Sequence, residues 1–152
     1  MSETPDATLP KSVGWLGYGG LWPFLGLALL VAFDPLRRPF WNQALIAYGA
    51  VILSFVGALH WAFAMLLQEL TPAQRRNRFV WSTLPALLAW PALLLPSHFA
   101  APLLVAGFLV HYWQDRALAS YARLPRWYLP LRLHLSTVAC IALASAALLA
   151  RG

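Results

Sequence analysis

Five long apolar segments, joined by short polar connections, fill most of the 152 residues of this chain. A helix of about 20 apolar residues, at about 1.5 Å per residue, crosses the hydrocarbon layer of a membrane. Hydrophobic residues make up 61% of the chain and charged residues 11%, whereas soluble domains carry about 25% charged residues. The sequence therefore predicts an all-α integral membrane protein that folds as a bundle of five transmembrane helices.

The predicted organisation is a polar N-terminal tail, residues 1–11, followed by a single transmembrane domain, residues 12–152. The tail lacks the pattern of a signal peptide or an Arg-rich transit peptide, so we expect the first helix to act as the insertion signal. Pro23 should kink that helix, and the polar and aromatic stretch 114–130 predicts a surface segment such as a short interfacial helix. The predicted helices cover about residues 12–33, 41–68, 72–95, 99–114 and 129–150.

The basic residues give a net charge of +6 and lie mainly beside helix ends. This placement suits membrane insertion and anionic lipid headgroups, and it argues against nucleic acid as a partner. Eight basic residues fall on the N-terminal side: Lys11, Arg75, Arg76, Arg78, Arg116, Arg123, Arg126 and Arg132. Three fall on the opposite side: Arg37, Arg38 and Arg151. The asymmetry predicts a cytoplasmic N-terminus and a periplasmic C-terminus. The excess of Arg over Lys, with abundant Ala and Leu, suggests a GC-rich bacterial genome, and the predicted location is therefore a bacterial inner membrane.

Several polar and aromatic side chains fall within the predicted helices, where an unpartnered polar group in lipid costs free energy. His60 shares a helix face with Gly57 and Ala64, so we expect it to face a neighbouring helix rather than lipid. His111 and Asp115 are four residues apart and should also share a face. The candidate intramembrane polar network consists of Tyr48, Ser54, His60, Trp61, His111, Asp115, Arg132 and His134.

One interpretation of this network is structural. Asp115 would pair with Arg132 or Arg116, and His60 would bond a backbone carbonyl or a tyrosine. Such a network would set the register of the helices without performing chemistry.

Three functional interpretations stay open beside the structural one. The first is a site for a quinone or a lipid headgroup around His60. The second is a bis-histidine haem site that pairs His60 with His111 or His134. The third is a proton path through His60, His111 and Asp115.

Catalysis has no support in the sequence. The chain has neither a GxSxG nor an HExxH motif and only five acidic residues, so no catalytic residue is predicted. Cys140 is the single cysteine, which excludes an intrachain disulfide and a cysteine metal site, and no metal ligand is predicted.

Three stretches carry a resemblance to a known family: LGYGGLWPF from Leu16, AYGAVILSFVGALHWAFA from Ala47, and the run from HYWQDR to RWYLPLRL, residues 111–133. Together they resemble the family of small membrane proteins that includes the animal transmembrane protein 69 and that occurs in proteobacteria and in organelles of bacterial descent. The positions that match its pattern are Tyr48, Ser54, Gly57, His60, Trp61, Asp115, Arg116, Trp127, Tyr128 and Arg132.

The resemblance implies a membrane fold and no particular catalytic residue. Because its organellar members suggest an energy-transducing membrane, we expect a non-enzymatic accessory, assembly or structural subunit of a membrane complex. The expected partners are the lipid bilayer and other membrane-protein subunits. The alternative is a ligand-handling protein with a quinone, haem or proton site around His60.

Overall fold

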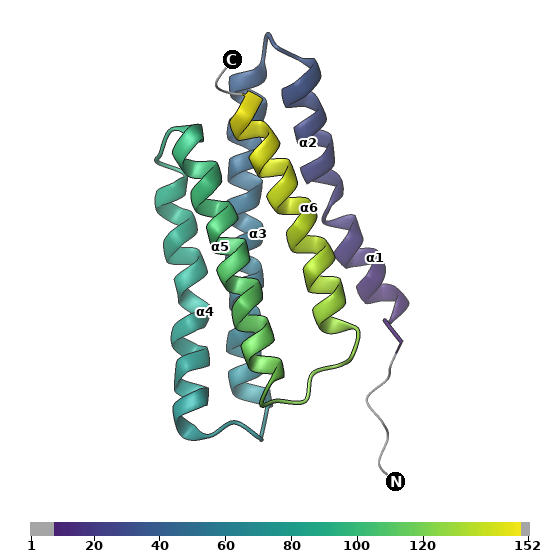
Figure 1. Ribbon diagram of the computed structural model, residues 1–152, viewed down its shortest axis with the longest axis vertical. Helices are drawn as coiled ribbons and strands as arrows, with labels where there is room; N and C mark the ends of the chain where they lie inside the picture. Colours follow the sequence, from purple (N-terminus) through teal and green to yellow (C-terminus); the bar gives the residue numbers. More distant parts are fainter. Residues whose placement is uncertain (1–7, 150–152) are drawn as a thin grey trace.

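The computed structural model describes residues 8–149, which form six helices and no strand. Figure 1 shows α3 to α6 running side by side along the long axis, with α1 and α2 forming a bent column next to them. The predicted all-α class is confirmed. In chain order the helices are α1 (Lys11–Gly19), α2 (Trp22–Phe33), α3 (Arg38–Leu66), α4 (Pro72–Ala92), α5 (Ser97–Ala119) and α6 (Tyr128–Leu149).

The first predicted helix, 12–33, is divided into α1 and α2. The break lies at Gly20 and Leu21, before Pro23 rather than at it. A proline has no N–H to bond the carbonyl four residues earlier, so the helix is interrupted there and begins again with a proline in its first turn. The hydroxyl of Tyr48 donates to the Gly20 carbonyl at 2.7 Å and ties the break to α3.

The turn between α3 and α4 is closed by side chains at both helix ends. Thr71 accepts a hydrogen bond from the Gln74 N–H, and the Gln74 side chain accepts one from the Thr71 N–H. This is a capping box with Thr71 as the N-cap. Arg75 donates to the Ala64 and Leu67 carbonyls at the end of α3, so the two helices form a tight antiparallel pair.

Two glycines permit the close contact of α3 with its neighbours. A Cβ added at Gly57 would lie 2.7 Å from Pro85 of α4, and one added at Gly107 of α5 would lie 2.6 Å from Leu53 of α3. Both distances are shorter than carbon atoms tolerate, and small residues are what allow helix backbones to approach in membranes. Because Gly57 and Ala64 are buried with His60, the predicted inward orientation of this face is confirmed.

Helix α5 continues to Ala119, whereas the sequence predicted an end near residue 114. The stretch predicted as a surface segment, 114–130, is therefore divided. Its first residues extend α5, residues 120–127 connect the helices, and its last residues begin α6. Asp115 consequently lies inside the bundle and is fully buried.

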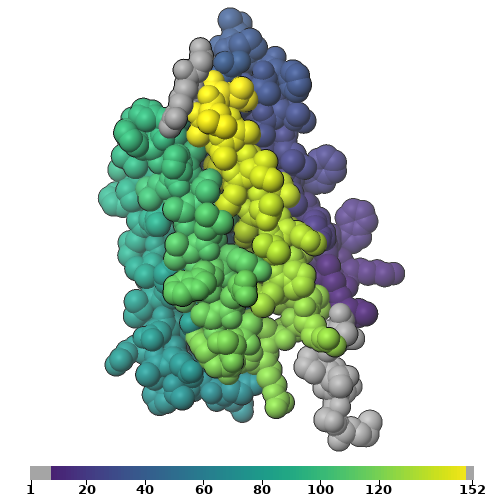
Figure 2. Space-filling view, in the orientation of Figure 1, coloured from purple at the N-terminus to yellow at the C-terminus, as the bar shows by residue number. Residues whose placement is uncertain are grey.

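Three helical stretches are long and apolar enough to cross a membrane: Lys11–Phe33, Arg38–Leu66 and Tyr128–Leu149. Helices α4 and α5 run beside α3 over much of its length (Figure 1) but carry more polar residues. Large side chains of α1 and α2 project from the body of the molecule in Figure 2, and Trp15 and Trp22 are 82% and 75% exposed. Exposed aromatic and aliphatic side chains on this scale fit a protein whose solvent is lipid.

Candidate functional site

Several buried polar side chains of the bundle gather around Asp115 of α5. Asp115 is near the end of α5, and Figure 1 shows that this end lies with the α3–α4 and α5–α6 connections. His60 reaches it from α3, His111 lies one turn before it on α5, and Tyr128 and Arg132 reach it from α6. The two pairs His111–Asp115 and Tyr128–Arg132 are each four residues apart, so each pair occupies one helix face. Three helices thus supply Asp115 and the residues nearest to its carboxylate.

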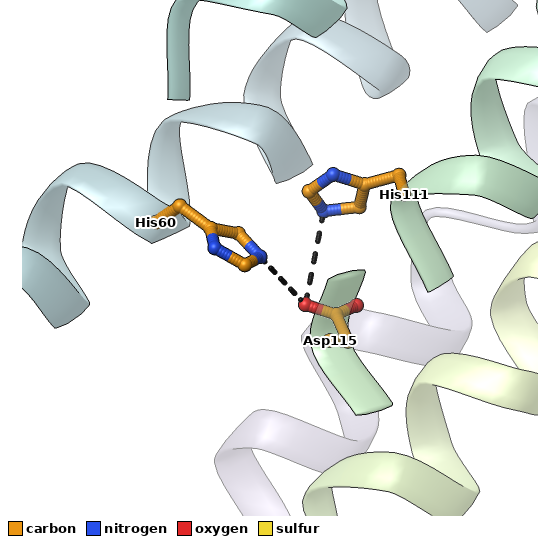
Figure 3. Close-up of side chains that lie close together, drawn as sticks. All are labelled: His60, His111 and Asp115. Atoms are coloured by element: carbon orange, nitrogen blue, oxygen red, sulfur yellow. Dashed lines mark hydrogen bonds and ion pairs between the residues drawn. The ribbon is translucent and has the colours of Figure 1, made fainter. Parts of the chain in front are cut away.

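The Asp115 carboxylate accepts hydrogen bonds at both oxygens. Oδ1 accepts from His60 Nε2 and from the Tyr128 hydroxyl, each at 3.0 Å, and Oδ2 accepts from Arg132 Nε at 2.9 Å. His111 Nε2 points at the same Oδ1 from 3.9 Å, as Figure 3 shows. A carboxylate accepts and does not donate, so this arrangement stabilises its ionised form.

The partners of the two imidazoles determine their tautomers. Arg78 Nη1 lies 3.4 Å from His60 Nδ1, and the Trp81 indole Nε1 lies 3.1 Å from His111 Nδ1. Guanidinium and indole groups only donate hydrogen bonds, so both Nδ1 atoms are acceptors. Each neutral ring therefore carries its proton on Nε2, which is the atom directed at Asp115.

Arg78 is a second buried cation in the cluster and comes from α4. Its Nη1 donates to the backbone carbonyl and to the side-chain oxygen of Gln114, both at 3.1 Å. The guanidinium carbon lies 5.5 Å from the centre of the Tyr121 ring, in a cation–π contact. With both imidazoles neutral, the two guanidiniums of Arg78 and Arg132 face one carboxylate, and the cluster carries an excess positive charge.

A metal ion is a poor fit to the cluster. One donor atom each of His60, His111 and Asp115 lies within 4.8 Å of the others, which is a ligand-like spacing. However, a metal needs an unprotonated imidazole nitrogen, and both Nε2 atoms carry protons. The nearby guanidiniums of Arg78 and Arg132 would also repel a cation. The cluster is therefore suited to holding the Asp115 carboxylate in place rather than to binding a metal ion.

A bis-histidine haem site is also disfavoured by this geometry. The rings of His60 and His111 are in edge contact, with centres 5.0 Å apart and planes at 74°. A porphyrin bound between them would have to separate these rings and break both contacts with Asp115.

The structure brings together half of the predicted network: His60, His111, Asp115 and Arg132. Asp115 pairs with Arg132 as the structural interpretation predicted. His60 bonds the Asp115 carboxylate rather than the backbone carbonyl or tyrosine that was predicted.

The other four predicted residues lie elsewhere. Tyr48 holds the α1–α2 break, and Ser54 donates to the Ala50 carbonyl of its own helix. Trp61 is 50% exposed and packs against the Phe79 ring. His134 of α6 lies near the Tyr18 hydroxyl, at 3.3 Å, in an exposed position.

Three cluster residues of α4 and α5 were not predicted: Arg78, Trp81 and Gln114. Arg78 was counted among the surface charges because it stands next to Arg75 and Arg76. A signal for its burial was present in the sequence. Arg78 is followed by small or apolar residues at alternating spacings of four and three positions, and this spacing marks the buried face of a helix. The buried residues of this face are Arg78, Ser82, Pro85, Ala89 and Ala92.

Tyr128 was predicted as an aromatic residue at the membrane interface and as a position that matches the family pattern, and it proves to be a direct partner of Asp115. Its place at the expected end of α6 concealed its role, since aromatic residues are common at membrane interfaces without any specific partner.

Comparison with known proteins agrees with the resemblance seen in the sequence. The family described as "Protein of unknown function (DUF3429)" matches residues 9–148. Transmembrane protein 69 of Xenopus tropicalis is 39% identical over 137 residues, which cover 88% of this chain and 53% of the relative. Transmembrane protein 69 of Mus musculus is 29% identical over 135 residues, which cover 87% of this chain and 54% of the relative.

The chain spans about half the length of these curated relatives. No solved structure matches it. The matched range, 9–148, includes every residue of the Asp115 cluster. This chain is a membrane protein that belongs to the transmembrane protein 69-like family DUF3429.

Proposed function

We propose that this protein is a non-enzymatic accessory, assembly or structural subunit of a complex in an energy-transducing membrane. The observation that carries the proposal is the set of hydrogen bonds by which the Asp115 cluster links neighbouring helices. His60, Tyr128 and Arg132 occupy the carboxylate oxygens, and Arg78 and Trp81 occupy the remaining imidazole nitrogens. A cluster with this connectivity joins α3, α4, α5 and α6 and fixes their register.

The same connectivity does not favour a proton path. A histidine that relays a proton takes it up at one nitrogen and releases it from the other. The Nδ1 atoms of His60 and His111 face groups that only donate, so neither can take up a proton without losing its present partner. His60, His111 and Asp115 are also fully buried.

We further propose that five helices cross a bacterial inner membrane, with the N-terminus in the cytoplasm. The residues of α4 that follow Arg78 carry no charged side chain, as the hydrocarbon layer requires. The burial of Arg78 and Arg132 removes two basic residues from the predicted cytoplasmic surface. Among the described residues the remaining asymmetry still supports this orientation. On one side are Lys11, Arg75, Arg76, Arg116, Arg123 and Arg126, and on the other Arg37 and Arg38.

The orientation is testable with reporter fusions. Fusions after Leu70 and after Ser97 should report opposite sides of the membrane, with the Leu70 fusion in the cytoplasm. Reports from the same side would contradict the crossing of α4.

The subunit role is testable by native electrophoresis of membranes from the producing organism. After gentle solubilisation we expect the chain in an assembly that contains other membrane proteins, and we expect stronger detergent to release it. Free chain at every detergent strength that solubilises it would contradict the role. The energy-transducing setting rests on the occurrence of the family in proteobacteria and organelles, and it requires that the co-migrating proteins belong to an electron-transfer or ATP-forming complex.

A further inference from the structure

A groove with apolar walls opens between α1, α3 and α6 and ends at the Asp115 cluster. Its volume is about 570 Å³, which lies within the usual range for ligand pockets. Its walls include Leu16 and Gly17 of α1, Phe55 and Leu59 of α3, and Leu135 of α6. Tyr128 and Arg132 line it as well, so two of the partners of Asp115 are also part of the groove.

A smaller recess of about 120 Å³ continues the groove into the bundle. It shares Leu16, Gly17 and Arg132 with the groove and adds Ser136 of α6. The space therefore passes from the open groove to a narrower end where Arg132 and Ser136 are polar groups among apolar side chains, a shape suited to a molecule with an apolar body and a small polar head.

Two buried groups at this polar end lack hydrogen-bond partners among the described residues. They are Nη2 of Arg132, whose residue is 4% exposed, and Oγ of Ser136, whose residue is 5% exposed. Buried polar groups in native proteins are nearly always paired. A hydrocarbon chain has no acceptor atom, so a lipid tail that enters the groove would leave both groups unpaired.

The depth of these two groups in the bilayer restricts the chemical class of the ligand. Ser136 is eight residues after Tyr128, where α6 begins, or about 12 Å along the axis. In a bilayer with a hydrocarbon layer about 30 Å thick, this depth lies well below the headgroups. The ligand must bring an acceptor oxygen into the hydrocarbon layer, and a neutral carbonyl can do so at a much lower desolvation cost than a phosphate.

Aromatic side chains line the wider part of the groove: Phe55 and Phe63 of α3, Trp127 just before α6, and Tyr128 at the start of α6. Aromatic walls favour a flat ring, which can stack on them or meet them edge to face. The required ligand is thus flat, soluble in the membrane, and equipped with carbonyl oxygens that only accept hydrogen bonds.

We propose that this groove binds an isoprenoid quinone. One carbonyl oxygen of the quinone ring accepts from Arg132 Nη2 and Ser136 Oγ, and the isoprenoid chain leaves along the apolar walls toward the lipid. The site is next to the location expected from the sequence, since Arg132 lines it and His60 does not. The proposal concerns binding and does not depend on the subunit role.

The test is equilibrium binding of a radiolabelled decyl-chain benzoquinone to the purified full chain in lipid nanodiscs. We compare Gly17→Leu with Gly19→Leu, because Gly17 lines the groove and a Cβ added at Gly19 meets no atom within 4 Å. Gly17→Leu should weaken binding at least about tenfold, whereas Gly19→Leu should leave it unchanged. Unfolding temperatures of both variants identify any loss that comes from misfolding.

A second pair of variants tests the hydrogen bond. Ser136→Ala removes the unpaired hydroxyl, and Ser145→Ala removes a hydroxyl that already donates to the Ala142 carbonyl of its own helix. We expect Ser136→Ala to weaken quinone binding by about threefold to tenfold, the usual effect of one hydrogen bond, and Ser145→Ala to have no effect.

Three outcomes would overturn the quinone assignment. These are the absence of saturable binding, equal affinity in the Gly17→Leu and Gly19→Leu variants, and displacement of the quinone by oleate or phosphatidylglycerol at equal or lower concentration. The last result would assign the groove to an acidic lipid. Because binding is measured on the isolated chain, its failure leaves the electrophoretic test of the subunit role unaffected.

Discussion

Asp115 and Arg132 lie on the neighbouring helices α5 and α6, and the Nε–Oδ2 hydrogen bond that joins them is 2.9 Å long. Their side chains are 0% and 5% exposed. A buried pair of this kind contributes little relative to an apolar pair, yet removal of one partner is costly because the other charge stays buried. The fold should therefore tolerate the loss of both charges better than the loss of either one.

A double-mutant cycle measures this relationship. Asp115→Asn and Arg132→Gln should each lower the free energy of unfolding by about 3–5 kcal/mol, and the double variant should lose clearly less than the sum. The measurement is denaturant unfolding in mixed micelles. Asp34→Asn, in the exposed α2–α3 turn, serves as the control and should change stability by less than about 1 kcal/mol. Strictly additive losses would mean that the pair is not coupled.

The tautomers of His60 and His111 can be observed directly by nitrogen NMR of histidine-labelled protein. Both rings should carry the proton on Nε2, because Arg78 and Trp81 donate to their Nδ1 atoms. Replacement of Trp81 by Phe should release this constraint at His111 and leave His60 unchanged. His98 is exposed and provides the reference. A proton on Nδ1 of either buried ring would refute the arrangement and reopen the question of metal binding.

The contact of α3 with α4 predicts opposite effects for two glycine substitutions. Gly57→Ala should destabilise the protein by about 1–3 kcal/mol, because the new Cβ would lie 2.7 Å from Pro85. Gly26→Ala is the matched control, since a Cβ there meets no atom within 4 Å. It should be neutral or stabilising by up to about 1 kcal/mol, because Ala is the better helix residue. Thermal unfolding of both variants in one detergent provides the comparison, and equal destabilisation would contradict the close packing.

The turn between α2 and α3 has a testable pH dependence. The Trp41 indole donates to the Asp34 carboxylate at 3.0 Å, and this bond, aided by the backbone N–H and the charge of Arg37, lowers the pKa of Asp34. A depressed native pKa means that the interaction stabilises the turn above the pKa of the unfolded chain and is lost as the pH falls through the native pKa.

Trp41→Phe removes the donor and should raise the pKa of Asp34 toward its ordinary value. The Asp34 carboxyl carbon can be followed by NMR titration in micelles. Trp90→Phe changes an exposed tryptophan of α4 and should leave the titration as it is in the wild type. An unchanged Asp34 midpoint in Trp41→Phe would show that the indole bond does not control the pKa.

Much of the fold could be predicted because lipid imposes simple rules on a chain. The break near Pro23 was predicted as a kink, but the hydrogen bond from Tyr48 to the Gly20 carbonyl joins residues 28 positions apart and could not be predicted from the local sequence. The sequence left open whether α5 continues beyond residue 114 for a related reason. Asp115 and Arg116 look like the start of a polar surface segment until the partners of Asp115 on α3 and α6 are known.

The candidate site was predicted in part, and helix geometry explains why some of the predicted residues lie outside the cluster. Arg132 and His134 are two residues apart, so their side chains point about 200° apart on an α-helix and cannot share one cluster. The sequence indicates that only one of them can face inward, but the packing of α6 decides which one. Similarly, Arg78 has the spacing of a buried face, but only its contact with Gln114 identifies it as part of the cluster.

The amino-acid sequence by itself determined that this protein is helical, that it belongs in a membrane, and that His111 lies directly above Asp115 on one helix. These properties follow from hydrophobicity and from the 3.6-residue period of the helix, which act within single segments. The tertiary structure alone decided that His60, Tyr128 and Arg132 meet at Asp115 and that a groove with two unpaired donors lies beside them. Such contacts depend on how each helix is rotated against its neighbours, and that rotation results from close packing at residues such as Gly57 and Gly107, far apart in the chain.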